Sequence, residues 1–359
     1  MSDTAISRHW TCVGPRSFFV RFGARLTQLR SPRPSCTMPH SMQVYLIRHW
    51  VPIFLLTSAA FAQVSPPKPP GDLVDLGGRR IHMLCAGTGS PTVLLENGGG
   101  SSSVEWTMVQ QLVAKTMRIC AYDRAGYAWS EHGAMDEGIE QAMDDLHLLA
   151  RKSSIRTPFI VVCQSLGCIF ARAYQRRFPD QVGAFVFVDG THDEGVTLAL
   201  DGKRIPISLL SREQLPKAYE EYRRSLPALS PGSASDPPFD RLSRDLQNAR
   251  HWAFEKMVQE IGWLPNSVAN AESWREEFSA LRQQRLETSH PLGSLPLVVL
   301  ERTKDTNEVW HAQELQLAGL SSTGRLIKAE GSGHMIHLER PDLIASAITQ
   351  VAAQSGTQH

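Results

Sequence analysis

A serine stands at the junction between an apolar run and a helical pattern. Residues 158–164 are almost entirely apolar, and the step Cys163-Gln164-Ser165-Leu166-Gly167 leads from them into the helical pattern. Small residues on both sides of such a serine let a strand and a helix approach closely, and the sharp turn between them lifts the hydroxyl off the sheet. Ser165 is therefore the candidate nucleophile. The alternative is that Ser165 only caps the helix that follows.

A histidine follows the last apolar run of the chain. His334 comes after the run 324–330 and a Gly-Ser-Gly step, and before a helical pattern that opens near Pro341. An imidazole with an unperturbed pKa of about 6.5 can take the proton of a serine hydroxyl and pass it to a leaving group near neutral pH. His334 is thus a candidate general base, a role that the family resemblance described below implies for this loop. His337 is the rival, which we interpret as a neighbour of the site or a polar residue at a helix start.

Short apolar runs alternate with longer amphipathic ones from residue 72 onward. This pattern predicts an α/β fold with a mostly parallel, doubly wound sheet, because strands covered on both faces are nearly continuously apolar. The predicted helices lie near 104–115, 138–152, 167–178, 307–319 and 341–353. The predicted strands are 79–86, 92–97, 117–123, 158–164, 182–189, 295–301 and 324–330.

One stretch, 192–290, interrupts this rhythm because it holds no convincing strand but several helical segments. Its roughly 100 residues far exceed an ordinary connection of about 4–6 residues, so we predict an inserted helical cap. The segment 230–238, rich in Ser and Pro, would divide the cap. Trp252 and Trp263 either contribute to substrate binding by roofing the pocket or belong to the core of the cap.

From about residue 72 to 353 the chain resembles the α/β-hydrolase family. Besides the step around Ser165, residues 123–130, Asp-Arg-Ala-Gly-Tyr-Ala-Trp-Ser, are similar to the Asp-x-x-Gly-x-Gly-x-Ser turn that follows the family's fourth strand. Residues 96–100, Glu-Asn-Gly-Gly-Gly, stand where the family has a His-Gly-x loop. The resemblance implies a hydrolase core at 72–191 and 291–359 with the cap between them.

The sequence departs from the family around the serine. Cys163 replaces the usual first Gly of the step, Gln164 the common His, and Cys168 the Gly that often follows. Cys is small enough for us to expect that the turn is preserved.

The resemblance also implies the acid that would orient His334. Asp305, just beyond the strand 295–301, has the family spacing, although Asp-Thr-Asn at 305–307 is also ordinary helix-cap chemistry. Glu301 is a second candidate. Asp189 is the alternative, because some family members take the acid from the strand before the cap.

An oxyanion would be held by two backbone N–H groups, one after the nucleophile and one from the early Gly-rich loop. By position these belong to Leu166 and Gly99, while Gly98 allows close approach and Gln164 lies beside the substrate. The Gly run could instead be a simple turn or a phosphate cradle. No G-x-x-x-x-G-K-[ST] pattern accompanies it, so the phosphate interpretation is weak.

Composition sets further bounds. The 359 residues carry a formal net charge of +1, which offers no field to gather nucleic acid or an anionic membrane. No C-x-x-C or His-rich spacing indicates a metal. Four cysteines fall in or beside apolar runs, where free Cys behaves as a small hydrophobe, so we expect no disulfide framework; they are Cys85, Cys120, Cys163 and Cys168.

Residues 42–62 have the layout of a signal peptide, with a cation, an uncharged run and a small-x-small end. The uncharged run is too short for the roughly 20 residues that span a bilayer, so we expect cleavage before Gln63 and no permanent anchor. The mature protein, secreted or periplasmic, would begin with a Pro-rich spacer, 63–71. Residues 1–41 either precede the true start at Met38 or Met42 or form an Arg-rich transit peptide.

These expectations combine into a cofactor-free serine hydrolase that cleaves an ester, thioester, lactone or amide of a small apolar molecule through an acyl-enzyme. A carboxylic ester hydrolase is favoured. A proline-iminopeptidase-like peptidase and a non-catalytic binding protein on the same fold are the alternatives. Epoxide hydrolases and haloalkane dehalogenases are disfavoured, because the relatives with those activities have Asp where this chain has Ser165.

Overall fold

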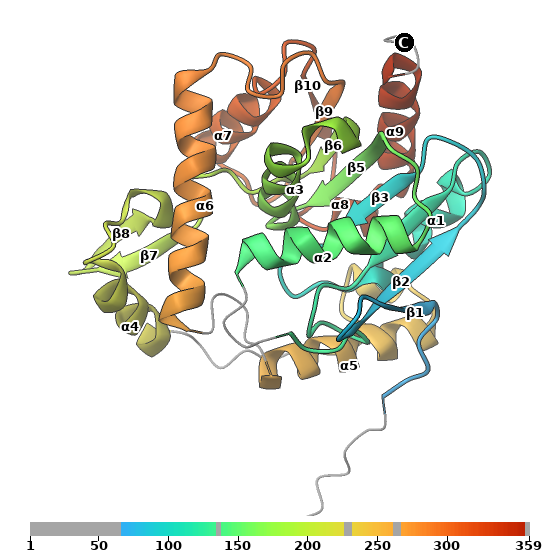
Figure 1. Cartoon of the computed structure of the whole chain (residues 1–359), viewed down its shortest axis with the longest axis horizontal. Helices are drawn as coiled ribbons and strands as arrows, with labels where there is room; N and C mark the ends of the chain where they lie inside the picture. Colours follow the sequence, from blue (N-terminus) through green and yellow to red (C-terminus); the bar gives the residue numbers. More distant parts are fainter. Residues whose placement is uncertain (1–65, 134–137, 226–231, 261–266, 356–359) are drawn as a thin grey trace, which may run out of the picture. The chain divides into compact units, whose positions relative to one another are not determined.

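The computed structural model describes residues 66–133, 138–225, 232–260 and 267–355 (Figure 1). The predicted extension 1–41, the signal peptide 42–62, the first residues of the spacer and Trp263 lie outside the described residues. In the part of the chain that is described, no helix is both long and apolar enough to cross a membrane.

An eight-stranded sheet forms the centre of the described part of the chain, with strand order β1-β2-β4-β3-β5-β6-β9-β10. The pairs β1–β2 and β2–β4 are antiparallel, and every later pair is parallel. All seven predicted strands are confirmed to within two residues at each end. The strands are β1 Asp72–Asp75, β2 Arg80–Ala86, β3 Val93–Glu96, β4 Ile119–Tyr122, β5 Phe159–Gln164, β6 Val182–Val188, β9 Leu297–Arg302 and β10 Arg325–Ala329. The sequence missed β1, whose four residues include two exposed acids.

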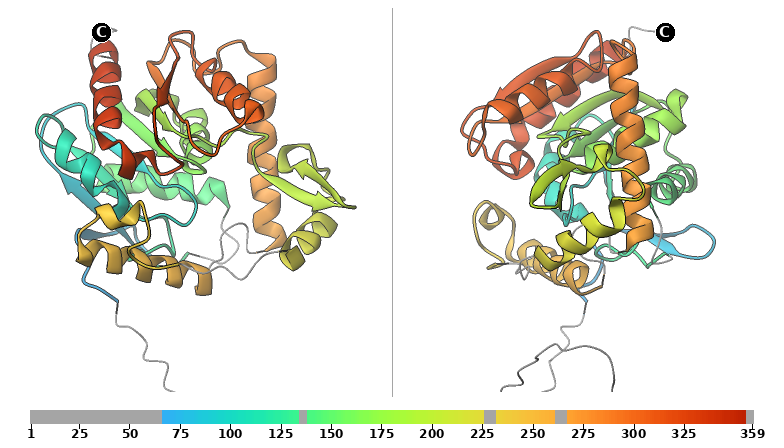
Figure 2. Two further views of the ribbon diagram at one scale, coloured as in Figure 1. Left: turned by 180° about the vertical axis from the view of Figure 1, so that it is seen from behind. Right: turned by 90° about the vertical axis from the view of Figure 1, so that its left-hand side faces the viewer.

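Helices cover both faces of the sheet because the central strands are apolar on both sides. Phe159 and Val161 of β5 pack with α2 (Ile139–Lys152) and α3 (Gly167–Arg177), which lie over one face (Figure 1). Ile160 and Val162 point to the other face and pack with α1 (Thr107–Val113) and α9 (Pro341–Ser355) (Figure 2). The predicted helices are confirmed, including the one near 307–319, which is α7 (Glu308–Ala318). The short helix α8 (Ile336–Glu339) lies between β10 and α9.

The inserted segment after β6 is mostly helical, as predicted, but it contains one hairpin. Strands β7 (Thr197–Leu200) and β8 (Lys203–Pro206) pair antiparallel, so the expectation of no strand in 192–290 is wrong there. Each strand has only four residues, too short for its pattern to stand out. The helices are α4 (Leu215–Ser225), α5 (Arg244–Glu260) and α6 (Val268–Glu287), and 230–238 falls between α4 and α5.

Two disulfides correct the expectation of free cysteines. Cys85 and Cys120 are direct partners across the antiparallel β2–β4 pair, and they are bonded. Cys163 at the end of β5 is bonded to Cys168 in α3, so the second disulfide brackets Ser165. The sequence identified all four as strand or helix positions but could not reveal which of them face each other.

The parallel topology determines where a site can form. The loops that follow β3, β5, β6 and β10 all leave the carboxyl edge of the sheet, where ligands bind in open α/β sheets. These loops carry the Gly run 98–100, Ser165, Asp189 and His334.

Candidate active site

Ser165 occupies the predicted sharp turn. β5 ends at Gln164 and α3 begins at Gly167, so only Ser165 and Leu166 connect them. Ser165 has φ 51°, in the left-handed region that a non-glycine residue rarely adopts. A Cβ on Gly167 would lie 2.5 Å from the backbone oxygen of Asn97, which explains why a small residue follows the serine.

His334 lies in the loop between β10 and α8, with its side chain 41% exposed. Its Nδ1 is hydrogen-bonded to the carboxylate of Asp189, and its Nε2 lies 3.1 Å from the side-chain nitrogen of Gln164. The imidazole therefore donates from Nδ1 and accepts at Nε2, the tautomer that a general base needs. The group at Nε2 is the Gln164 amide rather than the Ser165 hydroxyl, so that amide must move aside for proton transfer.

The acid beside His334 is Asp189, which corrects the prediction of Asp305. Asp305 is exposed, whereas Asp189 is completely buried at the end of β6. The backbone N–H groups of Thr303 and Lys304 both donate to the Ser332 carbonyl, so the chain leaves β9 beside that loop and Asp305 follows on the surface. The Glu301 carboxylate is hydrogen-bonded to His311, with Oε1 2.9 Å from Nδ1.

Two residues that the sequence analysis did not single out hold Asp189 in place. Arg302 donates to it from its backbone N–H (3.3 Å) and from Nη1 (2.8 Å), and the indole N–H of Trp310 donates at 3.1 Å. The Arg302 guanidinium also stacks over the Trp310 ring at 4.1 Å. Together they leave the carboxylate one orientation. In the sequence, the only indication of this role was that Arg302 ends an apolar strand.

His337, the rival base, is buried in α8. Its ring stacks against Trp106 with centroids 4.8 Å apart, and its Nε2 lies 3.7 Å from Glu105. It is 1% exposed, so it belongs to the packing beneath the site.

The Gly run lies against the turn, as the oxyanion prediction requires. A Cβ on Gly98 would lie 2.0 Å from Gln164 Oε1 and 3.3 Å from Ser165 Cβ, and one on Gly99 would lie 3.4 Å from Leu166 Cδ2. Buried Arg124 fixes this loop by donating to the carbonyls of Asn97 (2.6 Å) and Gly98 (2.8 Å). The geometry brings Gly99 and Leu166 together beside Ser165, and their role as oxyanion donors stays a prediction.

A cavity of about 470 Å³ opens at Ser165 and His334 and continues under the cap. Gln164, Gly99 and Leu166 line it, whereas Trp252 is not among its described lining residues. Trp252 instead packs on Trp129 with centroids 5.3 Å apart, so it belongs to the cap's contact with the core. Trp310 of α7 also lines the cavity. The cap supplies further lining residues, Val196, Thr197, Arg204, Tyr222, Phe239, Arg250 and Phe254.

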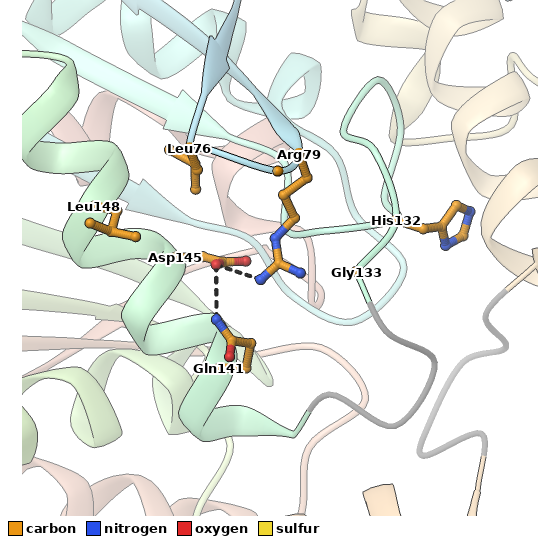
Figure 3. A pocket seen from close by; sticks show the side chains of 9 residues that line it. Leu76, Arg79, His132, Gly133, Gln141, Asp145 and Leu148 are labelled. Carbon is orange, nitrogen blue, oxygen red and sulfur yellow. Dashed lines mark hydrogen bonds and ion pairs between the residues drawn. The ribbon is translucent and has the colours of Figure 1, made fainter.

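A second hollow, between the β1–β2 turn and α2, shares no lining residue with that cavity (Figure 3). Three of its polar side chains contact one another at Asp145 Oδ1. Arg79 donates to Asp145 at 2.5 Å, and Gln141 donates to the same carboxylate oxygen at 3.2 Å. His132 also lines it, but no Ser, Thr or Cys is found among its described lining residues.

A model of the alpha/beta hydrolase family matches residues 93–347, more than half of the chain. The chain belongs to this family. The fold and the family predicted from the sequence are thereby confirmed. An AB hydrolase superfamily protein of Gibberella zeae is 24% identical over 280 residues, which cover 73% of this chain and 86% of that protein.

Solved structures of the same fold include an enol-lactonase and an esterase. The enol-lactonase of Burkholderia xenovorans matches with a TM-score of 0.51 and 18% identity, over 79% of this chain and all of that one. A thermophilic esterase of Thermogutta terrifontis matches with a TM-score of 0.52 and 18% identity, over 77% of this chain and 94% of that one. At these identities the likeness shows the fold alone.

Proposed function

We propose that this family member is a serine hydrolase that cleaves a carboxylic ester through an acyl-enzyme, with Ser165 as nucleophile, His334 as base and Asp189 as orienting acid. The observation that carries the proposal is the His334 ring. Its Nδ1 is held by a buried carboxylate, while its Nε2 is an acceptor beside the strained serine turn.

The proposed reaction has two halves. When the Gln164 amide moves aside, His334 takes the proton of Ser165 as its oxygen attacks the ester carbonyl, and the imidazolium is stabilised by Asp189. The N–H groups of Gly99 and Leu166 would hold the oxyanion, helped by the positive end of α3. His334 then protonates the leaving alcohol, and water releases the acid by the same steps in reverse.

The chemistry of the cavity disfavours the peptidase alternative. A peptidase that recognises a free amino terminus needs a carboxylate near the scissile bond to pair with the ammonium group. No Asp or Glu is found among the described residues that line this cavity.

The first test is Ser165→Ala. It should abolish hydrolysis of acyl esters and covalent labelling by a fluorophosphonate, because the hydroxyl is the atom modified. Ser211→Ala, at an exposed hydroxyl remote in sequence, serves as the matched control and should behave as wild type. Undiminished labelling of Ser165→Ala would refute the assignment.

We also propose that the protein is exported, secreted or periplasmic, with a mature start near Gln63. The pattern at 42–62 supports this, and so do the two disulfides, which persist mainly in oxidising compartments. Amino-terminal sequencing of protein from the native cell should give a start near Gln63. A mature chain that retains residues 1–41 would contradict export by this route.

A further inference from the structure

The described lining of the Ser165 cavity carries a one-sided charge. It contains two guanidinium groups, those of Arg204 and Arg250, and no carboxylate. The whole chain has a formal net charge of only +1, so this excess is local. A cavity walled by apolar side chains strengthens the attraction of such cations for an anion.

Arg250, on α5, has two buried guanidinium nitrogens without a hydrogen-bond partner. Its residue is 8% exposed, and neither Nε nor Nη1 has a hydrogen-bond partner. The Phe239 ring lies 3.2 Å from its Cζ, which fixes the plane of the guanidinium. Arg remains charged in proteins, so this guanidinium keeps its positive charge beside the cavity although its enclosed Nε and Nη1 make no hydrogen bond.

The nearest anion does not satisfy Arg250. Glu105 Oε1 lies 3.7 Å from Arg250 Nε, beyond hydrogen-bond distance, and accepts the backbone N–H of Ser102 at 3.1 Å. Its other oxygen has no hydrogen-bond partner and lies 3.7 Å from His337. Glu105 therefore helps to keep the buried cation charged without filling its donors. Burial itself lowers the pKa of Arg250, and Glu105 opposes that effect.

Arg204 has a different setting. It is exposed on β8 and donates to the hydroxyl (2.9 Å) and carbonyl (3.4 Å) of Thr197, another lining residue. This holds its charge at the rim of the cavity, where it would attract an anion rather than enclose it.

Resting on the proposed hydrolase function, we propose that the substrate is an ester or lactone that also bears a free carboxylate, and that Arg250 binds this carboxylate as the specificity-determining residue. Hydrolysis of such a half-ester breaks the acyl C–O bond and adds water. The products are an alcohol and a dicarboxylic acid when the carboxylate lies on the acyl side. The bound carboxylate would accept from the guanidinium once the side chain turns its enclosed Nε and Nη1 toward the cavity, and it would keep the ester carbonyl near Ser165.

The kinetic test compares two aryl esters of nearly equal size, mono-4-nitrophenyl glutarate and neutral 4-nitrophenyl butyrate. The wild-type mature chain should favour the glutarate in kcat/KM. Arg250→Met should lower the ratio of kcat/KM for the glutarate to kcat/KM for the butyrate by about 100-fold, as expected when one partner of a buried charged pair is truncated. Arg250→Lys should lie between, since an ammonium keeps the charge but not the planar fork. Arg244→Met, an exposed arginine on the same helix, is the matched control.

A binding measurement separates the two proposals. In the Ser165→Ala background, monomethyl glutarate should bind by calorimetry, and Arg250→Met should remove that binding. An equal fall in kcat/KM for both esters in Arg250→Met would refute the anion site, and so would binding of monomethyl glutarate that persists in this variant. Neither result would contradict the proposed hydrolase function. If the wild-type chain hydrolyses neither ester, the proposed substrate class is wrong, and calorimetry still decides whether Arg250 binds a carboxylate. Should Arg250→Met fail to fold, Arg250→Met/Glu105→Gln removes the unpaired buried charge and repeats the test.

Discussion

Asp189→Asn is the substitution that most directly tests the proposed catalytic arrangement. It keeps the shape of the side chain but replaces one acceptor oxygen with a donor. On the Oδ1 side the carboxylate accepts from the indole N–H of Trp310 and the backbone N–H of Arg302, and neither group can become an acceptor. With the amide oxygen on that side both of these hydrogen bonds are kept. The NH₂ group then faces His334 and also Arg302 Nη1, which donates to Oδ2 of the carboxylate at 2.8 Å, so this guanidinium donor must turn away.

The consequence is a change of tautomer. With an NH₂ group opposite, His334 Nδ1 must accept, so its proton moves to Nε2 and the ring can no longer take the Ser165 proton. In serine proteases this change costs about 10⁴-fold in kcat, or roughly 5 kcal/mol of transition-state stabilisation. We expect a loss of that order in Asp189→Asn.

The assay is kcat at saturating acyl ester for Asp189→Asn and for the control Asp305→Asn, with the fold checked by circular dichroism. Asp305 is exposed with φ 52°, a conformation that Asn tolerates, so the control should stay within about 2-fold of wild type. If Asp305→Asn loses activity and Asp189→Asn retains it, the assignment of Asp189 as the residue that orients His334 is refuted.

Two further predictions concern packing and pH. Gly167→Ala should lower the activity, and it should lower the free energy of unfolding by about 1–3 kcal/mol, because its Cβ would lie 2.5 Å from a backbone oxygen. Thermal melts compare this variant with the control Gly319→Ala, whose Cβ would have ordinary contacts. Equal melting temperatures for the two variants would contradict the prediction. Burial, with the nearby carboxylates of Asp189 and Glu301, raises the pKa of Glu314 well above its usual range. Because unfolded Glu ionises near about pH 4.3, the folded state holds the extra proton above that pH, and the free energy of unfolding falls as pH rises toward the folded-state pKa. Glu314→Gln should remove this decline in urea midpoints measured from pH 5 to 8, and an unchanged slope would show that Glu314 is ionised in the folded protein.

Much of the architecture could be predicted because its cause is local. The strands around 159–164 and 182–188 are continuously apolar, and burial on both faces of a parallel sheet requires that pattern. Ser165 could be identified for the same reason, since a turn of small residues is a property of neighbouring residues. The resemblance to the α/β-hydrolase family indicated His334.

What the sequence could not decide depends on which distant residues meet. Asp189 and Asp305 both follow apolar strands, and only the strand order and the path of the 303–305 turn place one beside His334 and the other on the surface. The cysteine pairs follow from the register of β2 on β4 and from the bend between β5 and α3. Arg250 is an ordinary helix residue in sequence, and it lines the cavity only because the tertiary structure brings α5 beside Glu105. Local pattern and the family resemblance thus indicated the elements and two of the proposed reacting groups. The proposed acid, the disulfides and the charge of the pocket depend on long-range packing, which no short stretch of sequence encodes.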